Sequence, residues 1–283
     1  MRLEDGYTNR TGPQPQRRRA QDAIMRIIVC SFLLLLADLA PSLAADCPGN
    51  PNAIGTSRVI AVDPAAYPMV GTWQYPQTLP LEDHEVVLTF DDGPLPPHTT
   101  RVLDTLKANC VKATFFIVGR MAKSFPGLVR RAAMEGHTVG THSEDHPMNM
   151  PALPLVRGEQ EIQDGIASVT KALGAPPAPF FRLPGFARSE AIEKYLASLG
   201  IMLWSTDVIA GDWKPISSDE VITRSLDRLT AKGKGILLLH DIHERTVQAL
   251  PTLLTQLQSA GFRIVHVVPA GPGHPKTVAA PSQ

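Results

Sequence analysis

The feature that most constrains the fold of this chain is a regular alternation of short apolar runs and helical stretches between residues 85 and 267. The run at 86–90 is almost continuously apolar, which is typical of a parallel strand buried on both faces. The stretch at 99–109 that follows it has apolar residues at helical spacing. About seven strand-and-helix pairs repeat this pattern, so the sequence predicts an α/β fold with a parallel sheet.

The number of repeated units favours a closed or nearly closed (β/α) barrel of seven or eight strands. Strands are expected at 86–90, 113–118, 137–141, 180–183, 201–204, 235–239 and 262–267, and helices at 99–109, 121–135, 155–173, 189–199, 217–231 and 243–260. A doubly wound open sheet is the alternative. That fold usually carries a Gly-rich phosphate loop after its first strand, whereas here the acidic segment Asp91-Asp92-Gly93-Pro94 follows.

The first 44 residues have the order of a secretory signal peptide. Arginines at 17–19 and 26 precede an apolar run at 27–40, and small residues, Ser42 and Ala44, then mark a cleavage site after Ala44. Met25 is an alternative start, with residues 1–24 as an extension. The run is short for a membrane span, so we expect a secreted or periplasmic protein with no integral span after cleavage; an uncleaved anchor is the alternative.

The rest of the chain is expected to hold one catalytic domain at 84–268. Residues 45–83 are rich in Pro, Gly and Thr and look like a lead-in segment, while 269–283 look like a flexible tail. Cys47 and Cys110 remain after signal cleavage, and the sequence leaves open whether they pair or stay as two thiols. The chain has 27 basic and 27 acidic residues, so no charge excess favours nucleic acid as a partner.

Ionisable residues follow five of the expected strands. They are Asp91-Asp92, His142 to His146, Arg182, the pair Asp207 and Asp212, and His240-Asp241. In a (β/α) barrel the carboxyl ends of the strands meet at one face, where active sites lie. Charged groups at so many strand ends cannot all be buried unpaired, which indicates a functional site at that face.

The spacing of two histidines suggests a metal site. His142 and His146 are four residues apart, and on a helical turn both rings would face the same way. Together with one of the two neighbouring aspartates they form a two-His-one-carboxylate set that leaves positions open for water and substrate. The other aspartate would be free to act as a base. The sequence holds no Gly-x-Ser-x-Gly nucleophile elbow, so the chemistry points to a metal-activated water.

Five motifs carry a resemblance to a known family. They are Thr89-Phe90-Asp91-Asp92-Gly93-Pro94, His142-Ser143-x-x-His146-Pro147, Phe181-Arg182-x-Pro184, Asp212-Trp213 and Leu238-x-His240-Asp241. In this order they resemble the motifs of the polysaccharide deacetylase family (the NodB homology domain, carbohydrate esterase family 4). The resemblance spans about 85–267 and implies a distorted (β/α) barrel that removes acetyl groups from N- or O-acetylated sugars.

The resemblance also implies roles for individual residues. Asp92, His142 and His146 would bind a divalent metal, usually Zn²⁺, with Asp91 as general base and His240 as general acid. Arg182 would hold Asp91, and Asp212 would orient His240. Substrate would meet the backbone N–H near Gly185, which binds the oxyanion, and the side chains of Trp213 and Leu238, which line the acetyl pocket.

Two departures from the family pattern concern the walls of the substrate groove. Gly185 stands where the family often has an aromatic residue, and Phe186 follows it. The stretch from Asp207 to Asp212 is longer than the usual gap between the two acids of the fourth motif, which leaves the role of Asp207 open.

The predicted function is a secreted metal-dependent deacetylase of peptidoglycan or of a chitin-like polymer of N-acetylglucosamine. Two alternatives are a hydrolase of non-sugar amides on the same fold and a catalytically inactive glycan-binding module. Export argues against the first. A base and an acid, Asp91 and His240, argue against the second, because a binding module needs neither.

Overall fold

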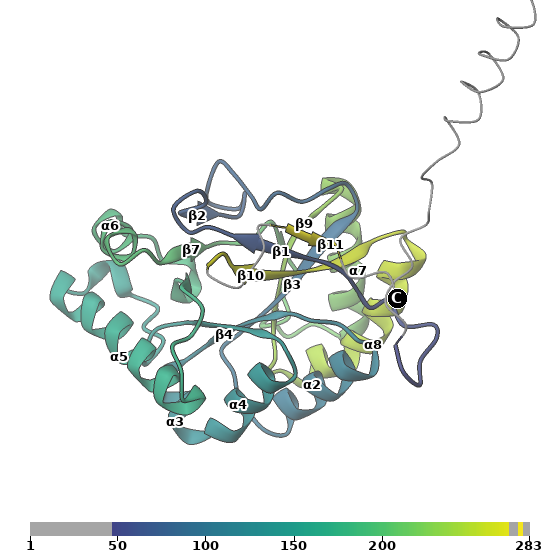
Figure 1. Ribbon diagram of the computed structural model, residues 1–283, viewed down its shortest axis with the longest axis horizontal. Coiled ribbons are helices and arrows are strands. Elements are labelled where there is room, and N and C mark those ends of the chain that lie inside the picture. The colour runs from purple at the N-terminus through teal and green to yellow at the C-terminus, as the bar shows by residue number, and fades with distance from the viewer. Residues whose placement is uncertain (1–46, 272–276, 280–283) are drawn as a thin grey trace, which may run out of the picture. The chain divides into compact units, whose positions relative to one another are not determined.

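The computed structural model describes residues 47–271 and 277–279; the predicted signal peptide at 1–44 lies outside the described residues. Parallel strands form the centre of the fold (Figure 1). They are β3 (Glu85–Asp91), β4 (Thr114–Ile117), β5 (Thr138–Thr141), β6 (Phe180–Arg182), β7 (Met202–Trp204), β8 (Val208–Ile209) and β9 (Gly235–His240).

These strands pair in the order β8-β9-β3-β4-β5-β6-β7, every neighbour parallel to the next. Within the described residues no strand pairing joins β7 to β8, so the barrel is interrupted there. A parallel strand order with one interruption is a distorted (β/α) barrel, so this prediction is confirmed. β8 has only two residues and was not expected from the sequence.

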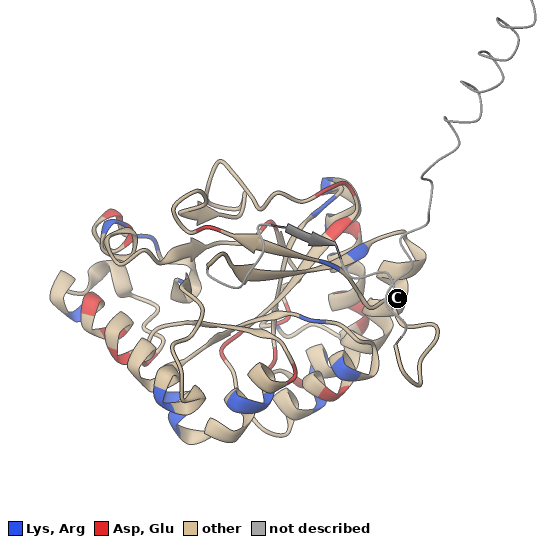
Figure 2. Ribbon diagram, in the orientation of Figure 1, with Lys and Arg blue, Asp and Glu red and all other residues tan. Residues whose placement is uncertain are grey.

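Helices connect successive strands, as the alternating pattern predicts. They are α2 (His98–Ala108), α3 (Gly119–Ser124), α4 (Pro126–Met134), α5 (Leu155–Leu173), α6 (Glu190–Ser198), α7 (Ser218–Lys232) and α8 (Glu244–Ser259), with 3-10 turns at Met150–Ala152 and Pro184–Phe186. Helices α2 to α5 lie along one side of the strands (Figure 1). Acidic and basic residues are interspersed on them, so this side carries no single sign of charge (Figure 2).

One helix prediction was wrong in its continuity. The segment expected as a single helix at 121–135 is divided at Phe125 into α3 and α4. Pro126 has no backbone N–H and cannot continue the hydrogen-bond ladder of α3, but its fixed φ suits the first position of the next helix. It accordingly begins α4.

The lead-in segment adds strands to the same sheet. β1 (Thr56–Val62) pairs parallel with β10 (Arg263–Pro269), which in turn pairs with the start of β3, and β2 (Met69–Val70) pairs with β7. The expected flexible tail at 269–283 contains β11 (Thr277–Ala279), which pairs antiparallel with β1. The free edge of β1 offers backbone groups with which this short strand can pair.

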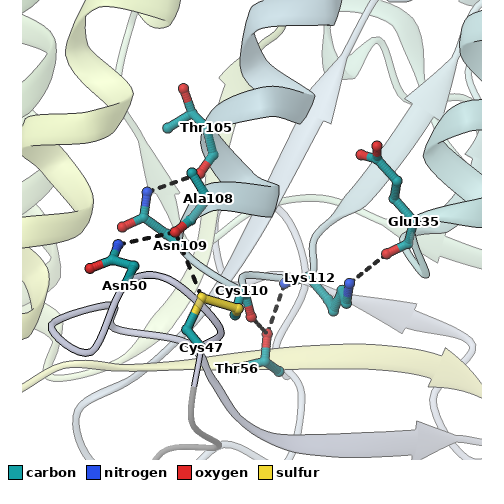
Figure 3. Close-up of a disulfide and its surroundings, with 9 residues drawn as sticks. All are labelled: Cys47, Asn50, Thr56, Thr105, Ala108, Asn109, Cys110, Lys112 and Glu135. Atoms are coloured by element: carbon teal, nitrogen blue, oxygen red, sulfur yellow. Dashed lines mark hydrogen bonds between the residues drawn. A yellow bond between two sulfur atoms is a disulfide. The ribbon is translucent and has the colours of Figure 1, made fainter.

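A disulfide fixes the start of the described chain. Cys47 is bonded to Cys110, which follows α2, and the Asn50 side chain donates a hydrogen bond to the Ala108 carbonyl beside it (Figure 3). The sequence had left this pairing open. The bridge lies before β4, at the amino ends of the strands, on the face opposite the strand ends that carry the ionisable residues.

The pleat of β3 shows how the barrel separates its two cores. Val86, Leu88 and Phe90 pack with the helices, whereas Val87 packs with residues that fill the barrel interior, among them Trp204. Because side chains alternate along a strand, Thr89 and Asp91 face the interior as Val87 does. The last residue of this buried strand therefore points a carboxylate into the barrel.

Among the described residues no helix is both long and apolar enough to cross a membrane.

Candidate active site

The two neighbouring aspartates at the end of β3 point to different partners. Asp91 is the last residue of the strand, and its Oδ1 accepts a hydrogen bond from Arg182 Nη1 at 2.7 Å. Asp92 has a left-handed backbone, with φ of 74°, which turns its side chain toward His142 and His146. The expectation that the two carboxylates have separate environments agrees with this geometry.

The turn after Asp92 requires a residue without a side chain. A Cβ at position 93 would lie 2.2 Å from Oδ2 of Asp241, a fully buried carboxyl. Thr99 donates a hydrogen bond to that same oxygen at 2.5 Å. Burial raises the pKa of Asp241 to about 7. Sequence reasoning assigned no role to Asp241, although it lies next to His240.

Asp92, His142 and His146 form a compact cluster. One potential ligand atom from each residue lies within 4.8 Å of the other two. Asp92 Oδ1 is 3.4 Å from His142 Nε2 and 3.1 Å from His146 Nε2. Burial alone would raise the pKa of the Asp92 carboxyl, but the two imidazoles outweigh burial and hold that pKa well below the ordinary value of an aspartate.

The two histidines are brought together by a loop and not by a helical turn. Residues 142–146 are irregular, and Ser143 and His146 have left-handed backbones, with φ of 63° and 58°. Ser143 Oγ accepts a hydrogen bond from His146 N at 3.0 Å, and the two ring centroids lie 4.8 Å apart. The two rings therefore lie close together through the conformation of this loop, and not through the helical turn that the spacing of four residues suggested.

The residues of this cluster fit a divalent cation. His142 Nδ1 lies 2.6 Å from the Arg182 carbonyl, which can only accept, so Nδ1 carries a proton and Nε2 is the ring nitrogen that faces Asp92 and that would coordinate a cation. Asp92 Oδ1 is buried yet receives no well-directed hydrogen bond from the described part of the chain. An unsatisfied buried carboxylate oxygen beside two imidazole nitrogens is the donor set that catalytic zinc sites use.

His240 stands on the other side of Asp92, with its Nε2 4.0 Å from Asp92 Oδ2. Its Nδ1 lies 2.8 Å from Oδ1 of the fully buried Asp212. Burial would lower the pKa of His240, but the Asp212 carboxylate outweighs burial and raises that pKa to about 9. The imidazole is therefore held protonated at neutral pH, with Nε2 turned toward the aspartates.

Arg182 is completely buried behind Asp91. Besides the bond to Asp91, its guanidinium donates to Thr89 Oγ1 at 2.9 Å and to the Ser205 carbonyl at 3.0 Å. It also lies over the Phe116 ring at 4.2 Å. A guanidinium held at so many points fixes the position of the Asp91 carboxylate.

A pocket of about 280 Å³ opens over these groups. It is lined by Asp91, Asp92, His142, His146, Met148, Leu183, Gly185, Phe186, Trp213, Leu238 and His240. Of the ten residues expected at the site, Arg182 and Asp212 lie behind the lining and the other eight form part of it. Met148 and Leu183 also line the pocket and were not predicted from the sequence. Met148 belongs to none of the five motifs, although it lies only two residues after His146.

The sequence also resembles known proteins along most of its length. A family model described as polysaccharide deacetylase matches residues 79–204. A chitooligosaccharide deacetylase of Rhizobium leguminosarum bv. trifolii is 31% identical over 198 residues, which cover 65% of this chain and 90% of that protein. The chain belongs to the polysaccharide deacetylase family.

Other polysaccharide deacetylases are similar over part of their length. A peptidoglycan-N-acetylglucosamine deacetylase of Listeria monocytogenes is 38% identical over 185 residues, 64% of this chain but only 38% of the relative. The solved structure of a Bdellovibrio bacteriovorus peptidoglycan deacetylase superposes with a TM-score of 0.69 at 28% identity, covering 76% of this chain and 60% of that one. The present chain thus spans well under half of the Listeria protein.

In this member of the polysaccharide deacetylase family, Asp207 lies apart from the pocket. Its carboxylate accepts hydrogen bonds from Thr72 N, from the hydroxyls of Thr72 and Thr78 and from Ile236 N, at 2.5 to 2.8 Å. These contacts tie the lead-in segment to the start of β9. The geometry gives Asp207 a structural place, and Asp212 alone of the two acids contacts His240.

Proposed function

We propose that this chain is a metal-dependent deacetylase that hydrolyses N-acetyl groups on peptidoglycan or on a chitin-like polymer of N-acetylglucosamine. The observation that carries the proposal is the convergence of three groups in one pocket: the Asp92/His142/His146 cluster, Asp91 held by Arg182, and His240 held by Asp212. The similar proteins include a peptidoglycan-N-acetylglucosamine deacetylase and a chitooligosaccharide deacetylase, which supports this class of substrate.

Asp92, His142 and His146 would hold the metal, and two histidines with one carboxylate favour Zn²⁺. When bound, such a cation supplies Lewis-acid polarisation of the acetyl carbonyl and lowers the pKa of water. Asp91 accepts the proton of the attacking water, and Arg182 keeps that carboxylate in place. The backbone N–H of Gly185, in the pocket wall, stabilises the oxyanion.

An amine leaves poorly unless it is protonated. His240 Nε2 faces the pocket from the opposite side of the cluster and donates this proton. Asp212 keeps the proton on Nδ1 and thereby presents Nε2 to the substrate. Trp213 and Leu238 form the apolar surface against which the acetyl methyl group packs.

We also propose that the protein is exported and that residues 84–268, with strands contributed by 45–83, form its catalytic domain. The basic, apolar and small-residue order of residues 17–44 supports export. The Cys47–Cys110 disulfide agrees with an oxidising compartment. Determining the N-terminal residue of protein recovered outside the cytoplasm tests this proposal. Cleavage after Ala44 predicts Ala45 as the first residue, and a different first residue would contradict cleavage at that site.

The function is tested by acetate release and metal analysis on one preparation. Purified protein is incubated with N-acetylglucosamine oligomers, isolated peptidoglycan and an O-acetylated glycan, with Asp91→Asn as matched control. Acetate from an N-acetylated glycan by the wild type alone is expected. Bound zinc without acetate from any glycan would contradict glycan deacetylation and favour the non-sugar hydrolase or the binding module.

A further inference from the structure

Glu144 lies in the loop that carries His142 and His146, two of the three proposed metal ligands, yet it does not line the pocket. The residue is buried, with 7% relative exposure. Taking a carboxylate out of water costs much free energy unless the group is paired and hydrogen-bonded. The partners of this carboxylate therefore indicate what it does.

Two helices supply these partners. Lys123, in α3, lies with its Nζ 2.6 Å from Glu144 Oε1, and Ser168, in α5, donates a hydrogen bond from its hydroxyl to Oε2 at 2.7 Å. Ser168 is buried as well, so water does not compete for this bond. The Glu144 side chain thus joins the loop to two helices on the outside of the strands.

Two glycines allow the loop to approach these helices closely. A Cβ on Gly119, the first residue of α3, would collide with Glu144 Oε2. A Cβ on Gly165, in α5, would lie 2.6 Å from the carbonyl carbon of Ser143. The Gly119 N–H also donates to the Ser143 carbonyl at 2.9 Å. Both helices therefore specify where the Glu144 carboxylate lies.

The two histidines depend on this loop to different degrees. His142 directly follows β5, and its ring is held by the Arg182 carbonyl, 2.6 Å from Nδ1. The His146 side chain is 21% exposed, and the chain reaches it through Ser143 and His146 itself, both with left-handed backbones. Such conformations cost free energy in residues other than glycine and persist only where surrounding contacts enforce them.

We propose that Glu144 is a positioning residue of the metal site, whose carboxylate ties the loop to α3 and α5 and so holds His146 where it binds the cation. Without this carboxylate the loop relaxes from its left-handed conformation and His146 moves toward solvent, whereas His142 stays in place. The inference rests on the proposed metal-dependent function and adds a residue outside both the pocket lining and the ligand set.

The test measures the zinc affinity of the purified protein by competition with a chromophoric chelator. Glu144→Ala should bind zinc about 10- to 100-fold more weakly than wild type, the usual scale for residues that orient metal ligands. Glu190→Ala is the matched control, because Glu190 pairs with Lys194 at the same 2.6 Å but on an exposed face of α6. Its zinc affinity should equal that of wild type.

A double-mutant cycle shows whether Glu144 acts through His146. Once His146→Ala has removed that ligand, adding Glu144→Ala should weaken zinc binding no further. A residue that only stabilised the fold would weaken zinc binding by the same factor with or without His146. Urea unfolding of the metal-free variants measures that contribution separately. If Glu144→Ala does not fold, the isosteric Glu144→Gln, which removes the charge facing Lys123, replaces it in both comparisons, with a smaller loss expected.

The outcomes separate the inference from the function on which it rests. Wild-type zinc affinity in the folded Glu144 variant, or losses that multiply in the double variant, would overturn the inference and leave the proposed ligand set intact. A wild-type protein that binds no zinc would remove the proposed metal site and the inference together.

Discussion

Asp212 holds His240 at two points: its Oδ2 accepts the backbone N–H of His240 at 2.7 Å, and its Oδ1 lies 2.8 Å from His240 Nδ1. The hydroxyl of Thr246 donates to the same Oδ2 at 2.6 Å, so the carboxylate itself is fixed. This arrangement sets the tautomer of the imidazole and accounts for its raised pKa.

Asp212→Asn should move the alkaline limb of the kcat/KM profile to lower pH. His240 acts in its protonated form, and its pKa of about 9 rests mainly on the Asp212 carboxylate. Removing that charge lowers the pKa, so the active fraction is lost earlier as the pH rises. Asp219→Asn, on the exposed first turn of α7, is the matched control. An alkaline limb that stays in place would show that another group supplies the proton.

The disulfide should matter for stability and not for catalysis. Cys47 and Cys110 are 63 residues apart, and a loop of that length corresponds to about 4 kcal/mol in the loop-closure model. The Cys47→Ser/Cys110→Ser variant should therefore unfold at lower urea concentration. Its acetate release and bound zinc under native conditions should match wild type, because the bridge lies at the other end of the strands. Equal urea midpoints, or lost turnover in a folded variant, would contradict this.

His266 should make the fold sensitive to acid. The Thr138 hydroxyl uses its one hydrogen on the Val267 carbonyl, at 2.6 Å, so the His266 Nε2 at 2.9 Å donates to Thr138 Oγ1. Burial lowers the pKa of His266 to about 4. A lowered folded-state pKa means that the stability is present above about pH 6.5 and is lost as the pH falls toward 4.

Urea unfolding at two pH values measures this effect. Between pH 7 and pH 5 His266 alone should cost about 2 kcal/mol of the free energy of unfolding. His266→Gln should lose less stability over that interval than wild type, while His84→Gln, at a half-exposed site, should behave as wild type. A loss of the same size in His266→Gln would assign the acid sensitivity to other groups.

The parts of the fold that follow from local pattern were predictable from the sequence. All seven residues of β3 and all six of β9 are buried, which matches their apolar runs. The helix expected at 155–173 has the bounds of α5, because Gly174 supplies the left-handed C-cap that ends it. Most of the candidate site residues could be located in the sequence for a similar reason, since they lie in or just after the last residues of recognisable strands.

Features that depend on distant residues or on loop backbone were not predictable. Asp207 takes its role from Thr72 and Thr78, which are far away in the sequence. The place of His146 depends on left-handed backbones that no residue type in that loop demands. Met148 fills the space beside Gly185, which follows a different strand. The pairing of Cys47 with Cys110 likewise depends on how the lead-in segment folds back.

The central claim is that the two neighbouring aspartates have different roles: Asp92 binds the metal, and Asp91 acts as the general base. The most direct measurement is bound zinc and acetate release, side by side, in Asp91→Asn, Asp92→Asn and His240→Asn. Asp91→Asn and His240→Asn should keep the metal and lose turnover by about 10²–10⁴-fold, the scale of a positioned general acid or base. Asp92→Asn should lose metal, in part restored by added zinc. Loss of metal in Asp91→Asn with retention in Asp92→Asn, or near wild-type turnover in Asp91→Asn, would contradict this account.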